Sequence, residues 1–197
     1  MNGNSELEEA KEPLHAGIDP NKTCGVGPGM AFANAILKKV SNKFGSIVLV
    51  PGAVGGTSIR EWSGPNSGLR RRLVKRTREA VRFGGKIRAI LWYQGEKDTE
   101  SEEGVNMYPS EYQGFVRSLY RELGNPQVPF IQVALASGQG DTKSLESVRA
   151  TQFAMENIIT VDAMGLALQK DGLHLTTMSQ VHLGNMLATA FLNTCSL

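Results

Sequence analysis

Short apolar runs rich in β-branched residues alternate along this chain with longer segments whose apolar residues recur at helical spacing. Each run is nearly all apolar, as in a strand that helices cover on both sides. The runs occupy residues 47–50, 87–92, 130–135 and 158–161. Helical spacing occupies residues 28–42, 67–83, 108–123, 144–155 and 178–193. This alternation predicts parallel strands joined by right-handed crossovers, in a three-layer α/β/α sandwich around a parallel sheet.

The boundaries of these segments have the residues expected at helix ends. Pro28 suits a first helical turn, and Gly124 follows the third helix. Thr177 and Gln180 form a predicted capping box for the last helix. The polar, acidic residues 1–12 are predicted to be disordered, which leaves one domain over residues 13–197.

Composition excludes little beyond a membrane-spanning chain. The 197 residues have a net charge of +2, which is too small to indicate a partner. No apolar run approaches the roughly 20 residues of a membrane helix, and the first residues do not form a secretory signal, so we expect a cytoplasmic protein by default. The two cysteines, Cys24 and Cys195, lack metal-ligand spacing and are predicted to be free thiols, with a disulfide between them as the alternative.

Unusual residues follow each predicted strand, where the loops of a parallel sheet gather ligands. Gly55, Gly56 and Thr57 follow the first strand, and paired glycines allow backbone N–H groups to approach a ligand. The later loops contribute Gln94, Glu96, Ser137, Asp171 and His174. A glycine pair is more often a simple turn, and Gln94 alone is equally explained as a structural hydrogen bonder. Four such loops at one edge favour a binding site.

Three motifs carry a resemblance to a known family: GGTSI at 55–59, WYQGE at 92–96 and DGLHL at 171–175. Together they resemble the SGNH-hydrolase superfamily, specifically its sialate O-acetylesterase-like branch, the plant carbohydrate esterases. PLHA at 13–16 and CGVGPG at 24–29 also resemble the plant members. The resemblance therefore extends over nearly the whole chain.

The resemblance implies an esterase that removes acetyl groups from sugars by a serine mechanism, without metal or organic cofactor. His174 is implied to be the general base and Asp171 the residue that orients it. The backbone N–H of Gly56 and the side-chain amide of Gln94 are implied to form the oxyanion hole. Gly55, Thr57, Glu96 and Ser137 are the candidate substrate-binding residues. The implied ligand is an acetylated small sugar or polysaccharide.

The sequence departs from the family at the nucleophile. The family's Gly-Gln-Ser-Asn motif does not occur in it, and no Gly-x-Ser-x-Gly elbow replaces that motif. Ser137 is the best local substitute, but a turn residue is the simpler interpretation. We therefore expect no nucleophile in this chain and negligible esterase activity. A catalytically inactive carbohydrate-binding or regulatory protein is the alternative function.

The strand that carries this motif in the family is also missing from the sequence. In the superfamily it lies between the strands corresponding to 47–50 and 87–92, so its loss predicts an unfilled slot or a shift of about 4.8 Å to close it. Either outcome lowers stability. We therefore expect a truncated gene model, splice form or fragment in preference to a purpose-built variant.

The basic run at 70–78 raises the alternative of RNA binding. Its apolar residues form a helical stripe that would face the sheet and leave the arginines in solvent, so we expect no nucleic acid partner. Salt-dependent binding to RNA would be required to keep the alternative. His15 and His182 have no spacing that pairs them with another metal ligand, and we expect no metal site.

Overall fold

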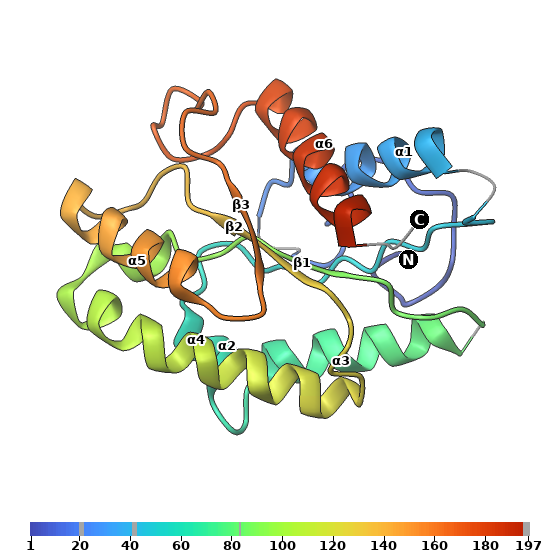
Figure 1. The fold of residues 1–197 in the computed structure, drawn as a ribbon, viewed down its shortest axis with the longest axis horizontal. Coiled ribbons are helices and arrows are strands. Elements are labelled where there is room, and N and C mark those ends of the chain that lie inside the picture. The colour runs from blue at the N-terminus through green and yellow to red at the C-terminus, as the bar shows by residue number, and fades with distance from the viewer. Residues whose placement is uncertain (20–21, 41–42, 83, 195–197) are drawn as a thin grey trace.

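The computed structural model describes residues 1–19, 22–40, 43–82 and 84–194. Helices and strands alternate along most of the chain (Figure 1). In order they are α1 (Pro28–Val40), α2 (Ile59–Ser63), α3 (Gly68–Val81), β1 (Ile90–Trp92), the 3-10 helix η1 (Lys97–Glu100), α4 (Glu102–Leu123), β2 (Phe130–Ala134), α5 (Thr142–Ala154), β3 (Ile159–Asp162) and α6 (Thr177–Thr194).

The three strands form one parallel sheet in the order β1-β2-β3. Ile90 lies opposite Phe130, and Ile131 lies opposite Ile159. Helices α1 and α6 cover one face of the sheet, and α2, α3, α4 and α5 lie on the other (Figure 1). The predicted class, an α/β fold with a parallel sheet between helical layers, is confirmed.

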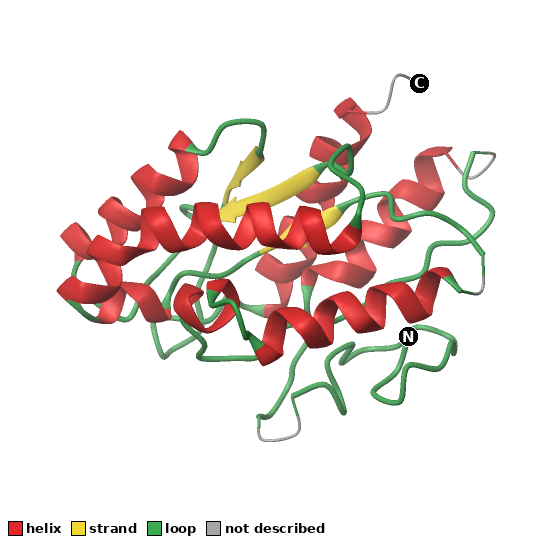
Figure 2. Cartoon of the chain, turned by 90° about the horizontal axis from the view of Figure 1, so that it is seen from below, coloured by secondary structure: helices red, strands yellow, loops and turns green. Residues whose placement is uncertain are grey.

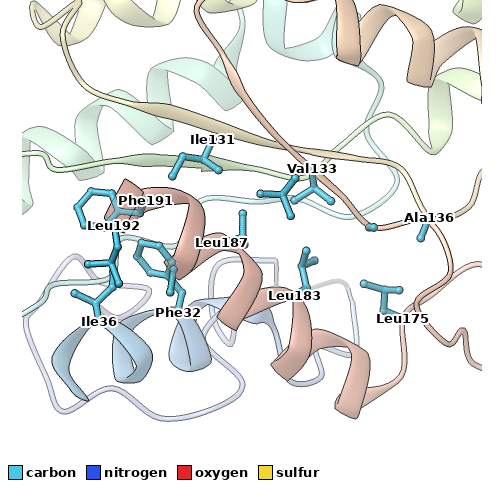
Figure 3. Packing of buried hydrophobic residues seen from close by; sticks show 13 residues of the cluster. Phe32, Ile36, Ile131, Val133, Ala136, Leu175, Leu183, Leu187, Phe191 and Leu192 are labelled. Carbon is cyan, nitrogen blue, oxygen red and sulfur yellow. The ribbon is translucent and has the colours of Figure 1, made fainter. Parts of the chain in front are cut away.

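Apolar side chains fill the space on both faces of the central strand β2. Ile131 and Val133 point toward α6, where they meet Leu183 and Leu187 (Figure 3). Phe130 points to the opposite face and belongs to a second cluster with residues of α4. Alternate residues of a strand face opposite sides of the sheet, so a strand between two helical layers is expected to be mainly apolar on both sides. Gln132 is the polar residue of β2, and its side-chain oxygen accepts from the Tyr112 hydroxyl at 2.6 Å. All five residues of β2 are buried, as the continuous apolar run predicts.

The predicted strand at 47–50 is not formed. No residue of this segment belongs to a strand, and Val48 is exposed. Among the described residues, no backbone hydrogen bond joins 47–50 to β1, and the carbonyl of Leu49 instead accepts from the Met1 amino group at 3.0 Å. β-branched composition makes a segment suitable for a strand, but a strand needs a neighbour at about 4.8 Å. The sheet therefore ends at β1.

The boundaries of several elements also differ from the prediction. α4 begins at Glu102, six residues before the predicted start at Tyr108, because Ser101 caps it by accepting from the Gly104 N–H. The predicted capping box of α6 is wrong, since the hydroxyl of Thr176, not Thr177, accepts from the Ser179 N–H. The predicted helix ends at 41–42 and 83 lie outside the described residues.

The segment before α1 forms no helix or strand (Figure 2). Met1 is buried, and the carbonyl of Asn2 accepts from Arg76 at 2.9 Å. Cys24 has a free thiol, whereas Cys195 lies outside the described residues. In the described ranges we find no helix with the length and apolarity to cross a membrane, and no group of three or more His, Cys, Asp or Glu side chains arranged for a metal ion.

The arginines of α3 do not all face solvent, which corrects the prediction for this helix. Arg71 and Arg72 are exposed, but Arg70 is only 2% exposed. Arg70 donates to the carbonyls of Trp62, Ser63 and Gly64 at the end of α2, and to a carboxylate oxygen of Glu122 at 2.9 Å. Arg76 is also buried and donates to the Pro51 carbonyl. A count of charges does not reveal which arginine meets unpaired helix-end carbonyls.

Replacing Arg70 by methionine tests this buried anchor. Arg70→Met removes the cation that pairs with Glu122 and leaves the carbonyls at the end of α2 without a donor. We expect it to lower the free energy of unfolding by roughly 3–5 kcal/mol, as for a broken buried ion pair. The exposed neighbour provides a matched control, because Arg71→Met should change stability by no more than about 0.5 kcal/mol. Equal urea midpoints for the two variants would contradict the assignment.

Candidate functional site

The four loops predicted to form one edge are joined by hydrogen bonds. The Gln94 side-chain amide donates to the carbonyl of Thr57 at 3.2 Å. The Gln139 N–H donates to the carbonyl of Glu96, also at 3.2 Å. The Ser137 hydroxyl donates to the carbonyl of Leu173 at 2.6 Å. The glycine loop, the loop after β1, the loop after β2 and the histidine loop therefore form one connected rim.

His174 and Asp171 form a local pair within a single turn. The Nδ1 of His174 lies 2.7 Å from Oδ2 of Asp171, and the other carboxylate oxygen accepts from the N–H groups of Leu173 and His174. The bond from the His174 ring, followed by the two backbone N–H groups, lowers the pKa of Asp171 to about 2. An ionised Asp171 can only accept, so Nδ1 carries the hydrogen and Nε2 is left for chemistry.

No serine of the described ranges hydrogen-bonds to His174. Ser137 is 5% exposed, and its hydroxyl is committed to the Leu173 carbonyl. It therefore fastens the histidine loop to the loop after β2. This contact matches the turn interpretation of Ser137 better than a nucleophilic one.

The glycine loop presents backbone at the rim. Gly56 has φ +72°, a left-handed conformation that a residue with a side chain rarely adopts. The neighbouring Gly55 N–H donates to Asp19 at 2.7 Å, and the Thr57 hydroxyl donates to the Val54 carbonyl at 2.8 Å. Among the described residues the Gly56 N–H has no hydrogen-bond acceptor, and Gly56 is exposed. In the same segment the N–H groups of Ser58 and Ile59 have acceptors, whereas that of Thr57, like that of Gly56, has none among the described residues.

Gln94 is 8% exposed, and both hydrogens of its amide are in use. The amide nitrogen donates to the Thr57 carbonyl and to Oδ2 of Asp98, the latter at 2.5 Å. Its side-chain oxygen is buried without a partner in the described part of the chain. For Gln94 to donate to an oxyanion, one of these two bonds must be exchanged.

Glu96 lies on the loop after β1, within electrostatic range of His174. It is half-buried, and burial raises the pKa of its carboxyl, while the charge of His174 acts in the opposite direction. A carboxyl group in this setting accepts hydrogen bonds from a polar ligand at the rim.

Thr99 was missed by the sequence reasoning. Its buried hydroxyl donates to the Glu96 carbonyl and accepts from the N–H groups of Gln139 and Gly140. A Cβ at Gly140 would lie 1.8 Å from the Thr99 carbonyl oxygen, so only glycine fits. The paired glycines at 138 and 140 were the available signal of this close approach.

Two cavities lie away from this rim. One, of about 410 Å³, lies against α1 and α6 and is lined by Met30, Asn34 and Val181 among others. The other, of about 360 Å³, lies along α3 beside Glu122. Neither is lined by the residues predicted for the site.

Comparison with known families assigns nearly the whole chain to one family. Residues 1–193 match the family model described as carbohydrate esterase, sialic acid-specific acetylesterase. The chain belongs to this family. It is 47% identical over 188 residues to the probable carbohydrate esterase At4g34215 of Arabidopsis thaliana, a match over 94% of this chain and 71% of the relative. The family predicted from the three motifs is thus confirmed.

Solved structures agree with this assignment. The X-ray structure of the At4g34215 protein superposes with a TM-score of 0.92 at 46% identity, over 98% of this chain and 79% of that one. XAC1771, a carbohydrate acetylesterase from Xanthomonas citri, superposes with a TM-score of 0.60 at 21% identity, over 81% of this chain and 39% of that one. The second comparison shows a shared fold.

The contact between Asp171 and His174 makes a prediction about the tautomer of the imidazole. Asp171→Asn replaces an obligate acceptor by an amide that can also donate, so we expect the Nδ1–H tautomer of His174 to lose population to the Nε2–H form. Long-range ¹H–¹⁵N correlation spectra measure this directly. His182 on α6 is exposed and serves as an internal control whose ring signals should not change. An unchanged His174 tautomer would show that Asp171 does not orient the ring.

Proposed function

We propose that the rim formed by the four loops is the ester-binding site of a carbohydrate O-acetylesterase domain. The observation that carries the proposal is the 2.7 Å contact between His174 Nδ1 and Asp171, which leaves Nε2 available on an exposed ring. This is the arrangement of a general base oriented by a carboxylate. Membership of the carbohydrate esterase family supports an acetylated carbohydrate as the ligand.

In a complete site of this kind, a serine hydroxyl attacks the acetyl carbonyl. His174 Nε2 takes the serine proton and returns it to the sugar oxygen as the C–O bond breaks, while Asp171 stabilises the imidazolium. Water then attacks the acetyl-serine with the same base. No step in this proposal uses a metal or an organic cofactor.

The developing oxyanion would be bound by two donors. The Gly56 N–H is supported as the first because it is exposed and has no acceptor among the described residues. Gln94 is the second, and it would donate by exchanging its bond to Thr57 or to Asp98. Removal of one such donor typically costs about 2.7–4 kcal/mol of transition-state stabilisation.

The remaining candidate residues would contact the sugar. Glu96 has the strongest case, since its half-buried carboxyl lies within the electrostatic reach of His174. Gly55 and Thr57 border the oxyanion donor along the chain. The hydroxyls of Thr57 and Ser137 already donate to backbone carbonyls, so each would contact a ligand as an acceptor.

This chain is proposed to be a very slow esterase, because no described serine contacts His174. Binding and oxyanion stabilisation without a nucleophile retain only about 10³–10⁴-fold acceleration over water. The same observation favours a second candidate function, a carbohydrate-binding or regulatory protein that keeps the rim without the chemistry.

Hydrolysis of p-nitrophenyl acetate tests the chemistry. We expect the rate of the chain to equal that of His174→Ala, since the base has no hydroxyl to activate. His182→Ala is the matched control for loss of an exposed imidazole that lies outside the rim. Turnover that is lost in His174→Ala and retained in His182→Ala would show that a nucleophile is present after all.

Ligand binding tests the site itself. An O-acetylated oligosaccharide should shift the amide resonances of Gly56, Gln94 and Glu96 in ¹H–¹⁵N spectra, and the same oligosaccharide after removal of its acetyl groups should bind more weakly. Resonance shifts confined to α1 and α6 would instead indicate that the ligand binds in the cavity against these helices. Such a result would remove the rim from the proposal.

A further inference from the structure

Asp98 is a buried carboxylate of η1 that bonds to two loops of the rim at once. It is 3% exposed. Both of its carboxylate oxygens lie 3.0 Å from the Ile59 backbone nitrogen, and Oδ2 also accepts from the Gln94 amide at 2.5 Å. A buried carboxylate is retained only where its lone pairs are satisfied, and here every donor belongs to the proposed oxyanion loops.

The two bonds of Asp98 converge on the same short segment. Ile59 is the first residue of α2, three residues after Gly56. Gln94, held by Asp98, uses its other hydrogen to hold the carbonyl of Thr57, one residue after Gly56. Asp98, Gln94 and the segment from Thr57 to Ile59 thus form a closed ring of hydrogen bonds. The position of the Gly56 N–H relative to Gln94 follows from that ring.

We propose that Asp98 is a positioning residue of the ester site, which holds the two oxyanion donors at a fixed separation through Ile59 and Gln94. The proposal rests on the proposed function only in naming Gly56 and Gln94 as those donors. Asp98 itself does not touch the ester. The ionised form of Asp98 sets the geometry of the glycine loop. Protonation of Asp98 weakens its bonds to Ile59 and Gln94 and so loosens that geometry.

The surroundings of Asp98 disfavour the ionised form of its carboxyl group. Burial raises the pKa of Asp98 from 3.8 to about 6, while the bonds from Gln94 and Ile59 act to lower the pKa. The charged and titratable groups facing Asp98 are Glu61 on α2, Glu96 before η1 and Tyr108 on α4. Both carboxylates are like charges, and neither neutralises it.

The raised pKa of Asp98 makes the stability of the folded chain depend on pH. Because the folded-state pKa is raised, the folded protein holds this proton more tightly than the unfolded chain does. The stability it contributes is present below about pH 4 and is lost as the pH rises through about 6. At neutral pH the chain therefore carries an ionised Asp98 at a cost to folding. Asparagine would avoid the charge but offers one acceptor oxygen instead of two to the Ile59 and Gln94 donors.

The test is a pH titration of the intact chain followed in ¹H–¹⁵N spectra. The side-chain amide of Gln94 and the backbone amides of Ile59 and Gly56 should shift together with one midpoint near pH 6. Gly56 makes no contact with Asp98, so its response reports transmission through the ring. In Asp98→Asn all three responses should disappear. The control is Asp141→Asn, in which the exposed carboxylate that caps the start of α5 is neutralised and the three responses should remain.

A second variant distinguishes the bond from Asp98 to Ile59 from the connection through Gln94 to the glycine loop. Gln94→Met preserves side-chain volume but removes the amide, so Ile59 should still titrate while the Gly56 response is lost. Since the Gln94 bond lowers the pKa of Asp98, the midpoint at Ile59 should also move to higher pH. This variant and the wild-type titration decide the question even if Asp98→Asn fails to fold.

Two results would overturn the inference. One is a Gly56 amide that does not shift with the midpoint of Ile59 in the unmodified chain. The other is a Gly56 response that survives in Gln94→Met or Asp98→Asn, which would assign it to Glu96. These spectra require no turnover and no ligand, so absence of acetyl-sugar binding would refute the proposed function without affecting this test.

Discussion

The arrangement of the rim depends on how the chain leaves β1 and β2. Where these strands end, their backbone groups lose their partners in the sheet, and Gln152 of α5 takes their place. Its amide oxygen accepts from the Leu135 N–H at 3.0 Å, and its amide nitrogen donates to the Gln94 carbonyl at 3.1 Å. Gln152 is buried, so water cannot substitute for these bonds. The side chain of Gln152 therefore helps to determine the directions of the two loops that carry Gln94 and Ser137.

Much of this architecture was predictable because it is local. A run such as 130–135, in which every residue but Gln132 is apolar, is typical of a strand whose two faces are both covered, and β2 with its two core clusters agrees. Asp171 and His174 were recognisable because a three-residue spacing closes within one turn. Gln152, Thr99 and Arg70 were not predictable. Gln152 and Thr99 satisfy backbone groups far away in the sequence, and Arg70 lies where the end of α2 meets Glu122 of α4. The backbone partners of Arg70 are the nearby residues 62–64, and its distant partner is the side chain of Glu122. Nothing in the immediate sequence of these three residues distinguishes them from surface residues.

The segment 47–50 is the clearest failure of local reasoning, and it changes how the glycine loop is held. Its residues favour a strand, yet strand formation depends on a neighbour, and the described sheet ends at β1. A loop that follows a paired strand is placed by the sheet. The glycine loop follows an unpaired segment, and side chains hold it instead: Asp19 at Gly55, and Asp98 with Gln94 at its far end. Side-chain hydrogen bonds thus replace backbone pairing at this side of the rim.

The two halves of the proposed site consequently differ in their dependence on the fold. The His174 and Asp171 pair is closed by contacts within four consecutive residues, and only the bond from Ser137 to Leu173 ties it to the loop after β2. The oxyanion donors depend on contacts that span about forty residues, from Ile59 to Asp98. A disturbance of the sheet edge beside β1 would therefore reach the oxyanion donors first and leave the base in place. The base is the robust part of this site, and the geometry of the donors is the part that a change at the sheet edge, or in the charge of Asp98, can alter.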